Sequence, residues 1–261
     1  MVYTMRLFLV VLARDKRHIG EKIDELKNLD VPYIIVCGEP TRTSGVVYRT
    51  PRGKYDAINF AAELIPEDAD IVAFNDVDTR ITCNFRDMLR HFKDKKVAIV
   101  FASERVKEGP QVLFLRMLNP IRKRIPLASS GELMMVRRDI LPALLPLKPC
   151  KAEDTYMMFK ALELGYKAVF CEECHAETVR TKRIEKETPY RRKTVAGIYQ
   201  ALSYTKPPWL VRIFYTFLPF ASVLFLVLGR KGYYWTKGIL LGFLDYARGD
   251  RSGSWKTEYM D

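Results

Sequence analysis

Short apolar runs, many of them rich in β-branched residues, alternate with longer amphipathic stretches through the first hundred residues. Five of these runs are expected to form strands: residues 5–12, 33–37, 46–48, 70–74 and 97–102. Between them, residues 55–65 carry apolar side chains at helical spacing and end at a proline. Strands separated by helical connections are typical of βαβ units. The pattern predicts an α/β fold: a Rossmann-like, mostly parallel sheet flanked by helices.

The second half of the chain is less regular. We expect a strand at 132–136, a helix at 154–164 and a strand at 168–171, but a long irregular excursion at 110–130, where Gly-Pro and Asn-Pro pairs occur. From residue 207 the composition becomes strongly apolar. The sequence therefore predicts an α/β domain over 1–205 and a C-terminal hydrophobic and amphipathic helical segment over 206–261.

The charge balance restricts the kind of partner. The chain has 261 residues and 43 Lys+Arg against 31 Asp+Glu, a net charge of +12. Such an excess favours an anionic partner, which could be nucleic acid, nucleotide phosphates or an acidic membrane surface. The five cysteines, an odd number, and the absence of a signal-peptide pattern favour a reducing, cytoplasmic setting.

Two carboxylates follow the expected fourth strand. Asp76 and Asp78 are one residue apart, at the edge of a parallel sheet where ligands bind. Carboxylates in this arrangement suit a hard divalent cation that bridges a diphosphate. Aspartates are also common in ordinary strand-end turns, so this motif alone is weak.

Four further segments strengthen that interpretation, because they occur in the order found in one enzyme family. They are residues 53–59 (Gly-Lys-x-x-Ala-x-Asn), 130–138 (Ser-Gly-Glu and a later Arg pair), 152–167 (Ala-Glu-Asp-Thr and then Gly-Tyr-Lys) and 190–197 (Tyr-Arg-Arg-Lys-Thr-x-x-Gly). Together with the D-x-D strand, they resemble the family 2 inverting glycosyltransferases, which have the GT-A fold.

The resemblance implies a role for each matching residue. Asp154 would be the catalytic base. The residues implied for the nucleotide-sugar are Ala13, Arg14, Glu39, Lys54, Asp76, Arg191 and Lys193. The metal ligands, for Mg²⁺ or Mn²⁺, would be Asp76, Asp78 and His175. The acceptor side would consist of Gly131, Glu132 and Glu153. Without the flanking motifs, Glu153 and Asp154 would be ordinary acidic residues at a helix N-terminus.

The chain departs from the family pattern in two places. Glu39 stands near the position of an aspartate that contacts the base, and Tyr190 and Thr194 replace the glutamine and tryptophan of the last motif. That tryptophan is associated with polymer synthesis. Its absence favours the addition of a single sugar.

Cys171, Cys174 and His175 form the string C-x-x-C-H, which is also a haem-attachment pattern and could supply three zinc ligands. Haem attachment requires an exported chain. We therefore expect no haem and no structural zinc, with both cysteines as free thiols and His175 near the metal of the D-x-D motif.

The C-terminal segment is expected to attach the protein to the cell membrane. Residues 213–229 carry no charge over 17 residues, which is roughly 25 Å of helix. Basic and aromatic residues flank this run, and Pro219 is expected to kink it. We expect a helical hairpin that is shallowly inserted or lies in the interface, near a lipid-linked acceptor, with the catalytic domain facing the cytoplasm. The alternatives are a buried helix pair or a homo-oligomer interface.

Two other function classes remain open. A nucleotidyltransferase acting on sugar phosphates also uses paired carboxylates, but residues 12–16 lack the glycine-rich loop that it needs. A non-enzymatic basic protein could bind lipid or nucleic acid. The basic run 180–193 carries no nucleic-acid-binding motif, so no nucleic-acid partner is expected.

Overall fold

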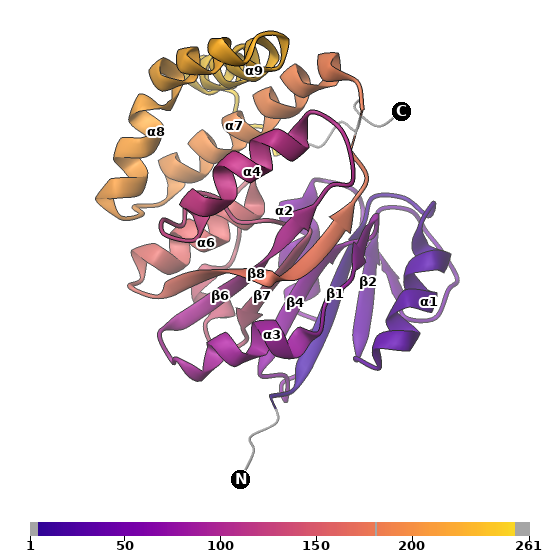
Figure 1. Ribbon diagram of the computed structural model, residues 1–261. Coiled ribbons are helices and arrows are strands. Elements are labelled where there is room, and N and C mark those ends of the chain that lie inside the picture. The colour runs from indigo at the N-terminus through magenta and orange to yellow at the C-terminus, as the bar shows by residue number, and fades with distance from the viewer. Residues whose placement is uncertain (1–4, 181, 254–261) are drawn as a thin grey trace.

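The computed structural model describes residues 5–180 and 182–253, which form one curled sheet with helices on both faces (Figure 1). The strands in chain order are β1 (Leu7–Ala13), β2 (Tyr33–Cys37), β3 (Val46–Tyr48), β4 (Ile71–Asp76), β5 (Thr79–Ile81), β6 (Val97–Arg105), β7 (Leu133–Arg137) and β8 (Lys167–Thr178). Their order in the sheet is β3-β2-β1-β4-β7-β6-β8-β5.

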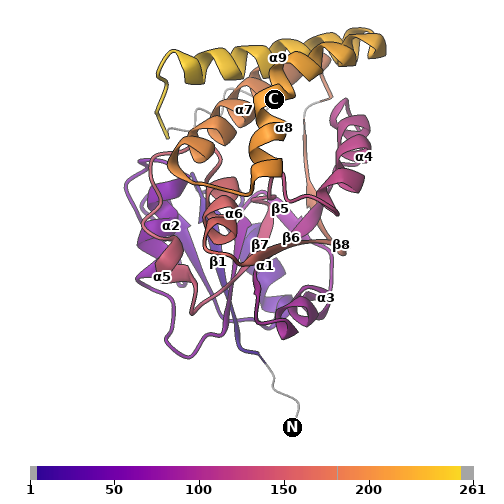
Figure 2. The same cartoon turned by 90° about the vertical axis from the view of Figure 1, so that its left-hand side faces the viewer.

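Most helices alternate with the strands along the chain, and the last ones form a separate group at the C-terminal end. They are α1 (Ile19–Leu29), α2 (Lys54–Ala62), α3 (Phe85–Leu89), η1 (Arg90–Lys93), α4 (Gln111–Arg122), α5 (Leu141–Leu144), α6 (Glu153–Glu163), η2 (Ile184–Lys186), α7 (Glu187–Tyr204), α8 (Trp209–Ala221), η3 (Ser222–Leu228) and α9 (Arg230–Ala247). In Figures 1 and 2, α7, α8 and α9 lie together beyond one edge of the sheet.

The sheet combines two parallel parts. Strands β3, β2, β1 and β4 are parallel, and β6 is parallel to β8. Strand β7 runs antiparallel between β4 and β6, and β5 runs antiparallel to β8. The predicted α/β class is confirmed. The antiparallel β7 has a functional consequence, because its first residues lie at the same edge as the last residues of β4 and β6.

Both faces of the sheet are buried, which explains the continuous apolar runs. In β1, Phe8, Val10 and Leu12 join the core that contains α6 and α7, whereas Leu9 and Val11 join the core beneath α1 and α3. A strand covered on both faces needs apolar side chains at every position rather than at alternate ones.

The expectation of an irregular excursion at 110–130 is wrong for the first half of this segment. Helix α4 occupies Gln111–Arg122, with Pro120 inside its last turn. A proline there removes one hydrogen bond near a helix end, which costs less than a proline in the middle of a helix. The helical spacing of Phe114, Leu118 and Ile121 was the stronger signal.

The prediction of a free thiol at Cys174 is also wrong. Cys174 forms a disulfide with Cys83, 91 residues away in sequence, whereas Cys171 is free and buried. The pairing follows from topology, because β5 runs antiparallel to β8 and places the next loop beside the middle of β8. The disulfide removes the cysteine argument for a reducing compartment.

Helix α9 packs along α7 through small residues. A Cβ added to Gly238 would lie 2.8 Å from the Thr188 carbonyl oxygen, and one added to Gly242 would lie 2.5 Å from the Arg192 carbonyl oxygen. Trp235 is fully buried and donates a hydrogen bond from Nε1 to Glu187 Oε2 at 3.0 Å. The second half of the C-terminal segment is therefore packed onto the helix that ends the first predicted domain.

Gly197 provides a test of how closely α7 packs on the segment before α6. A Cβ at this position would lie 2.7 Å from the Ala152 backbone nitrogen. We expect Gly197→Ala to lower the free energy of unfolding by about 1–3 kcal/mol, because the backbones must move apart. Urea denaturation measures this change.

The matched control is Gly20→Ala in α1, where a Cβ would meet nothing within 4 Å. Alanine is a better helix former than glycine, so this control should be as stable as wild type or more stable. Equal stability of the two variants would contradict the close α7 contact.

Candidate functional site

A cavity of about 790 Å³ opens at one edge of the sheet. Residues at the ends of β1, β4, β6 and β8 line it, together with those just before β7 and at the start of α6: Ala13, Asp76, Glu104, Thr178, Gly131, Glu132, Glu153 and Asp154. Ligands of α/β sheets bind outside the carboxyl ends of the strands. The antiparallel β7 adds its first residues to that edge.

Lys54 lies at the centre of the polar end of this cavity. Its Nζ is 2.7 Å from Asp76 Oδ1 and 3.1 Å from Glu153 Oε1, and its side chain is 13% exposed. Burial acts to lower the pKa of Lys54, but the carboxylates of Asp76 and Glu153 raise it well above its usual value. The ammonium group is therefore charged and joins the end of β4 to the start of α6.

Gly131 leaves the space that this ion pair needs. A Cβ at this position would lie 2.9 Å from Lys54 Nζ and 3.4 Å from Asp154 Oδ2. A larger residue would push the Lys54 ammonium away from its carboxylate partners.

Asp76 ends β4, Asp78 follows it, and both residues line the cavity. Burial raises the pKa of Asp76 to about 6, and the Asp78 carboxylate adds to this effect while Lys54 opposes it. A bound cation would relieve the cost of holding two ionised carboxylates in this buried place. The donor set, two carboxylates beside a space for phosphate oxygens, fits Mg²⁺ or Mn²⁺.

Beneath these aspartates lies a buried polar chain that the sequence analysis missed. Lys22 Nζ donates to Asn75 Oδ1 at 2.8 Å and to the Thr79 carbonyl oxygen, and it pairs with Glu25 at 2.8 Å. Asn75 in turn donates to the Glu132 carbonyl oxygen. These bonds fix both ends of the Asp76–Asp78 loop. Only the three-dimensional contacts distinguish Lys22 from other lysines on an amphipathic helix.

Asp154 is the second residue of α6, and its side chain faces the same cavity. Its Oδ1 accepts a hydrogen bond from the Thr155 backbone N–H at 2.7 Å. Burial raises the pKa of Asp154 to about 7, with a further contribution from the neighbouring Glu153 carboxylate. A carboxyl group with this pKa can take up a proton near neutral pH.

Glu132 belongs to a second buried ion pair, whose partner the sequence analysis also missed. Arg180 forms a salt bridge with Glu132, and Ser130 Oγ donates to Glu132 Oε2 at 2.6 Å. Burial acts to raise the pKa of Glu132, but the Arg180 guanidinium holds it below its usual value. Arg180 lies at the start of the basic run 180–193, and no local signal distinguishes it from the other basic residues there.

Helix α7 lines a further part of the cavity with basic side chains. Arg191 and Lys193 both face it, as predicted. The Arg191 guanidinium lies 3.4 Å from the centre of the Phe114 ring and 3.5 Å from Glu187 Oε2. Burial lowers the pKa of Lys193 to about 7. A phosphate close to Lys193 would favour its charged form.

The structure places most of the predicted residues together, but two lie apart. Ala13 and Arg14 line the cavity, whereas Glu39 and His175 do not. His175 pairs with Ser103 within the sheet, and the β8 residue that lines the cavity is Thr178.

The far end of the cavity is apolar. Its walls come from α4, α8, η3 and α9, and include Phe114, Leu118, Leu218, Leu224, Phe225 and Ile239. Arg122 lies at the border between the polar and apolar ends; it is buried, and its Nε and Nη2 atoms have no hydrogen-bond partner. Glu104 is 3.4 Å from its Nη1.

Solved structures with the same architecture are known. The chain is similar to the mannosyltransferase PcManGT from Pyrobaculum calidifontis, which was solved in complex with GDP-Man and Mn²⁺. The two sequences are 20% identical, and the TM-score is 0.64. The match covers 95% of this chain and 77% of that chain. It is also similar to GalNAc-T7, solved with UDP, GalNAc and Mn²⁺, with 11% identity, 95% and 57% covered, and a TM-score of 0.54. No family model matches the sequence, and no curated protein matches it. These structural likenesses confirm the GT-A-type fold.

Proposed function

We propose that this protein is a glycosyltransferase that moves a sugar from a nucleotide-sugar to an acceptor, with inversion at the anomeric carbon and with Mg²⁺ or Mn²⁺ as cofactor. One observation carries the proposal: Asp76, Asp78 and Asp154 open into a single cavity at the ligand-binding edge of a GT-A-type sheet. PcManGT and GalNAc-T7, which share this fold, were solved with Mn²⁺ and with a nucleotide-sugar or a nucleotide.

The donor is proposed to bind with its diphosphate between the loop after β4 and helix α7. Asp76 and Asp78 would hold the divalent cation, which neutralises charge on the leaving diphosphate. Arg191 and Lys193 approach the cavity from the α7 side and would bind phosphate oxygens. Lys54 keeps Asp76 in place through its 2.7 Å ion pair.

Asp154 is proposed to take the proton from the acceptor. The acceptor oxygen then bonds to the anomeric carbon on the face opposite the diphosphate, and the carbon–oxygen bond to the diphosphate breaks with its electron pair. Glu153 Oε1 lies 3.1 Å from Lys54 Nζ, whereas Asp154 is not part of that ion pair. This difference favours Asp154 as the base.

The donor proposal predicts the behaviour of Asp78→Ala. Calorimetry with UDP- and GDP-sugars should show Mn²⁺-dependent binding by the wild type and a loss of that dependence in the variant. Its thermal unfolding should be almost unchanged, because Asp78 makes little contact with the core. Metal-dependent binding that survives in the variant would contradict the assignment.

The base proposal predicts a pH profile. The kcat/KM of the wild type should fall as the pH drops through about 7, because Asp154 must be unprotonated to accept a proton. Asp154→Asn should lower turnover by roughly 10²–10⁴-fold while donor binding is kept.

Glu153→Gln is the matched variant for this profile. Removing the Glu153 charge lowers the pKa of Asp154, so the acid limb of the profile should move to lower pH. An unmoved limb, or normal turnover in Asp154→Asn, would show that another group is the base.

The acceptor is proposed to be lipid-linked. The cavity continues from the carboxylates into an apolar end formed by α4, α8 and η3, which suits a hydrocarbon chain. Arg122, buried with two unpartnered guanidinium nitrogens at the border, would receive a phosphate at the head of that chain. The cavity thereby places a lipid head group next to Asp154. The addition of a single sugar agrees with Thr194 at the position of the polymer-associated tryptophan.

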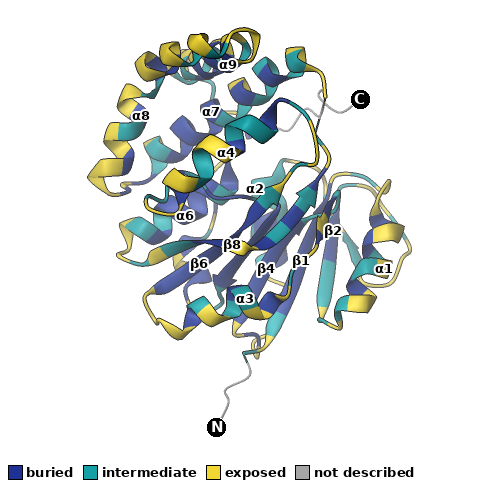
Figure 3. Cartoon of the chain, viewed as in Figure 1, coloured by how far each residue is buried: buried dark blue, intermediate teal, exposed yellow. Residues whose placement is uncertain are grey.

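Membrane attachment is proposed through α8 and η3. Residues Trp209–Leu228 have a mean hydropathy of 2.0 over their most apolar window, of which 22% is buried in the structure. Figure 3 shows exposed residues along the outer faces of α8 and α9. Arg212, Arg230 and Lys231 are exposed beside this surface and suit anionic lipid. We propose that the protein lies on the cytoplasmic leaflet of the cell membrane, because the anionic lipids of that leaflet attract exposed basic residues.

Phe220 and Val227 test this attachment, because they are 76% and 86% exposed and do not line the cavity. The double variant Phe220→Glu/Val227→Glu should bind vesicles containing anionic lipid at least roughly tenfold more weakly, because burying one such side chain contributes about 1.5–3 kcal/mol. Vesicle flotation measures the bound fraction.

Leu64→Glu, an exposed apolar site in the turn after α2, is the control and should bind vesicles as the wild type does. Unchanged flotation of the double variant would contradict membrane attachment. A change from oligomer to monomer in light scattering would assign the surface to a contact between copies.

A further inference from the structure

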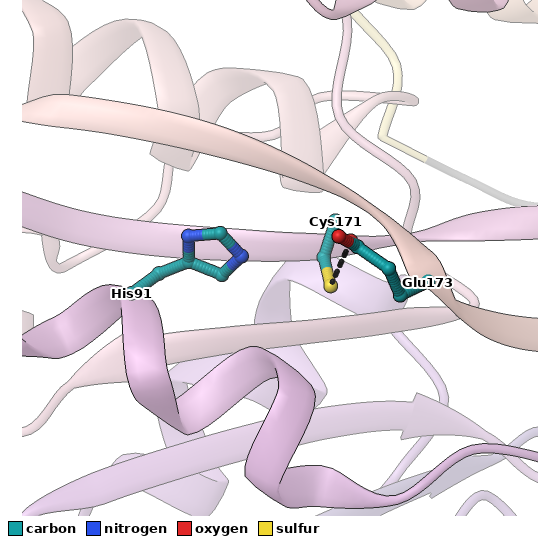
Figure 4. Close-up of side chains that lie close together, drawn as sticks. All are labelled: His91, Cys171 and Glu173. Atoms are coloured by element: carbon teal, nitrogen blue, oxygen red, sulfur yellow. Dashed lines mark hydrogen bonds between the residues drawn. The ribbon is translucent and has the colours of Figure 1, made fainter.

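A second group of metal-ligand side chains lies away from the cavity. His91 of η1 and Cys171 and Glu173 of β8 bring one ligand atom each within 4.8 Å of one another (Figure 4). In Figure 4 a ring nitrogen of His91 points toward Cys171 and Glu173. None of the three lines the cavity.

A bulge in β8 creates this group. Cys171 pairs with Ala102 and His175 pairs with Ser103, so residues 172–174 have no counterparts on β6. The bulge carries Glu173 back over Cys171, where Oε2 lies 3.5 Å from Sγ. Bulges re-aim side chains and are common at functional places.

The three side chains are suited to bind a cation together. The Nε2 atom of His91 is buried without a hydrogen-bond partner. Arg90 pairs with Glu173 Oε1 at 2.5 Å, which leaves Oε2 directed at the sulfur. Cys171 is not part of a disulfide, so its sulfur can bind a metal that displaces the thiol proton.

We propose that His91, Cys171 and Glu173 bind a zinc-type transition ion, with water in the fourth position. On binding, the Cys171 thiol loses its proton to solvent, and the sulfur, the imidazole nitrogen and a carboxylate oxygen each bond to the ion. A thiolate, an imidazole and one carboxylate together suit Zn²⁺, whereas Mg²⁺ or Mn²⁺ at the carboxylate site prefers oxygen ligands.

The proposed site differs from the one suggested by the string C-x-x-C-H. Cys174 is held in the disulfide with Cys83, and His175 lies in the sheet pairing, so neither serves. The ligand from outside the string is His91, 80 residues before Cys171 in the printed numbering. A bound ion would tie η1 to the β8 bulge beside the disulfide.

Cobalt substitution in the full chain tests the proposal. Chelator-treated wild type should bind one Co²⁺ with a thiolate-to-cobalt charge-transfer band, and Zn²⁺ should displace it. Cys171→Ser should abolish the band, and His91→Gln should weaken Zn²⁺ binding at least tenfold. His91 is only half-buried, so its variant keeps the test valid if Cys171→Ser does not fold.

Two controls separate this site from the rest of the protein. Cys150→Ser changes another buried free thiol and should keep the band. Asp78→Ala should also keep it, because that carboxylate belongs to the proposed donor site. A wild type without the band, a band that survives in Cys171→Ser, or full Zn²⁺ affinity in His91→Gln would overturn the proposal.

Discussion

The ion pairs of Lys54 are the interaction on which the rest of the site depends. One ammonium group, 2.7 Å from Asp76 and 3.1 Å from Glu153, compensates the negative charges of carboxylates on β4 and α6. Without it, four carboxylates, Asp76, Asp78, Glu153 and Asp154, would share a buried edge of the sheet, and an uncompensated buried charge costs several kcal/mol. Gly131 leaves room for this ammonium, because a Cβ there would lie 2.9 Å from Lys54 Nζ.

The same electrostatic arrangement separates the two proposed chemical roles. Asp76 lies against the Lys54 ammonium, whereas Asp154 lies beside Glu153 and has the higher pKa, about 7 against about 6. Asp76, beside the Lys54 ammonium, is thereby suited to bind metal, and Asp154, beside the Glu153 carboxylate, is suited to accept a proton. Burial raises the pKa of both aspartates, and their charged neighbours then act on them differently.

Much of the fold, and less of the site, could be predicted from the sequence. The strand at 33–37 and the aspartates after β4 follow from local pattern, because each depends on neighbouring residues along the chain. Lys22 and Arg180 depend on partners 53 and 48 residues away, and nothing in their own segments marks them. The Cys83–Cys174 pairing and the β8 bulge likewise result from the register of β8 against β5 and β6. The motifs that resemble family 2 glycosyltransferases, and not the periodicity, indicated residues that the structure brings into one cavity.

The C-terminal helices are part of the site architecture. Helix α9 fits against α7 at Gly238 and Gly242, and α7 also carries Arg191, which lines the cavity. Beyond α9 the chain returns toward Lys54: Gln200 donates to the carbonyl oxygens of Asp250 and Ser252, and a Cβ on Gly53 would lie 2.6 Å from the Gly253 oxygen. The C-terminal helices and the segment after them therefore contact both α7 and the start of α2, which border the cavity. The proposed membrane attachment and the proposed catalysis would therefore use the same packed helices, because residues of α8 and Asp154 line one cavity.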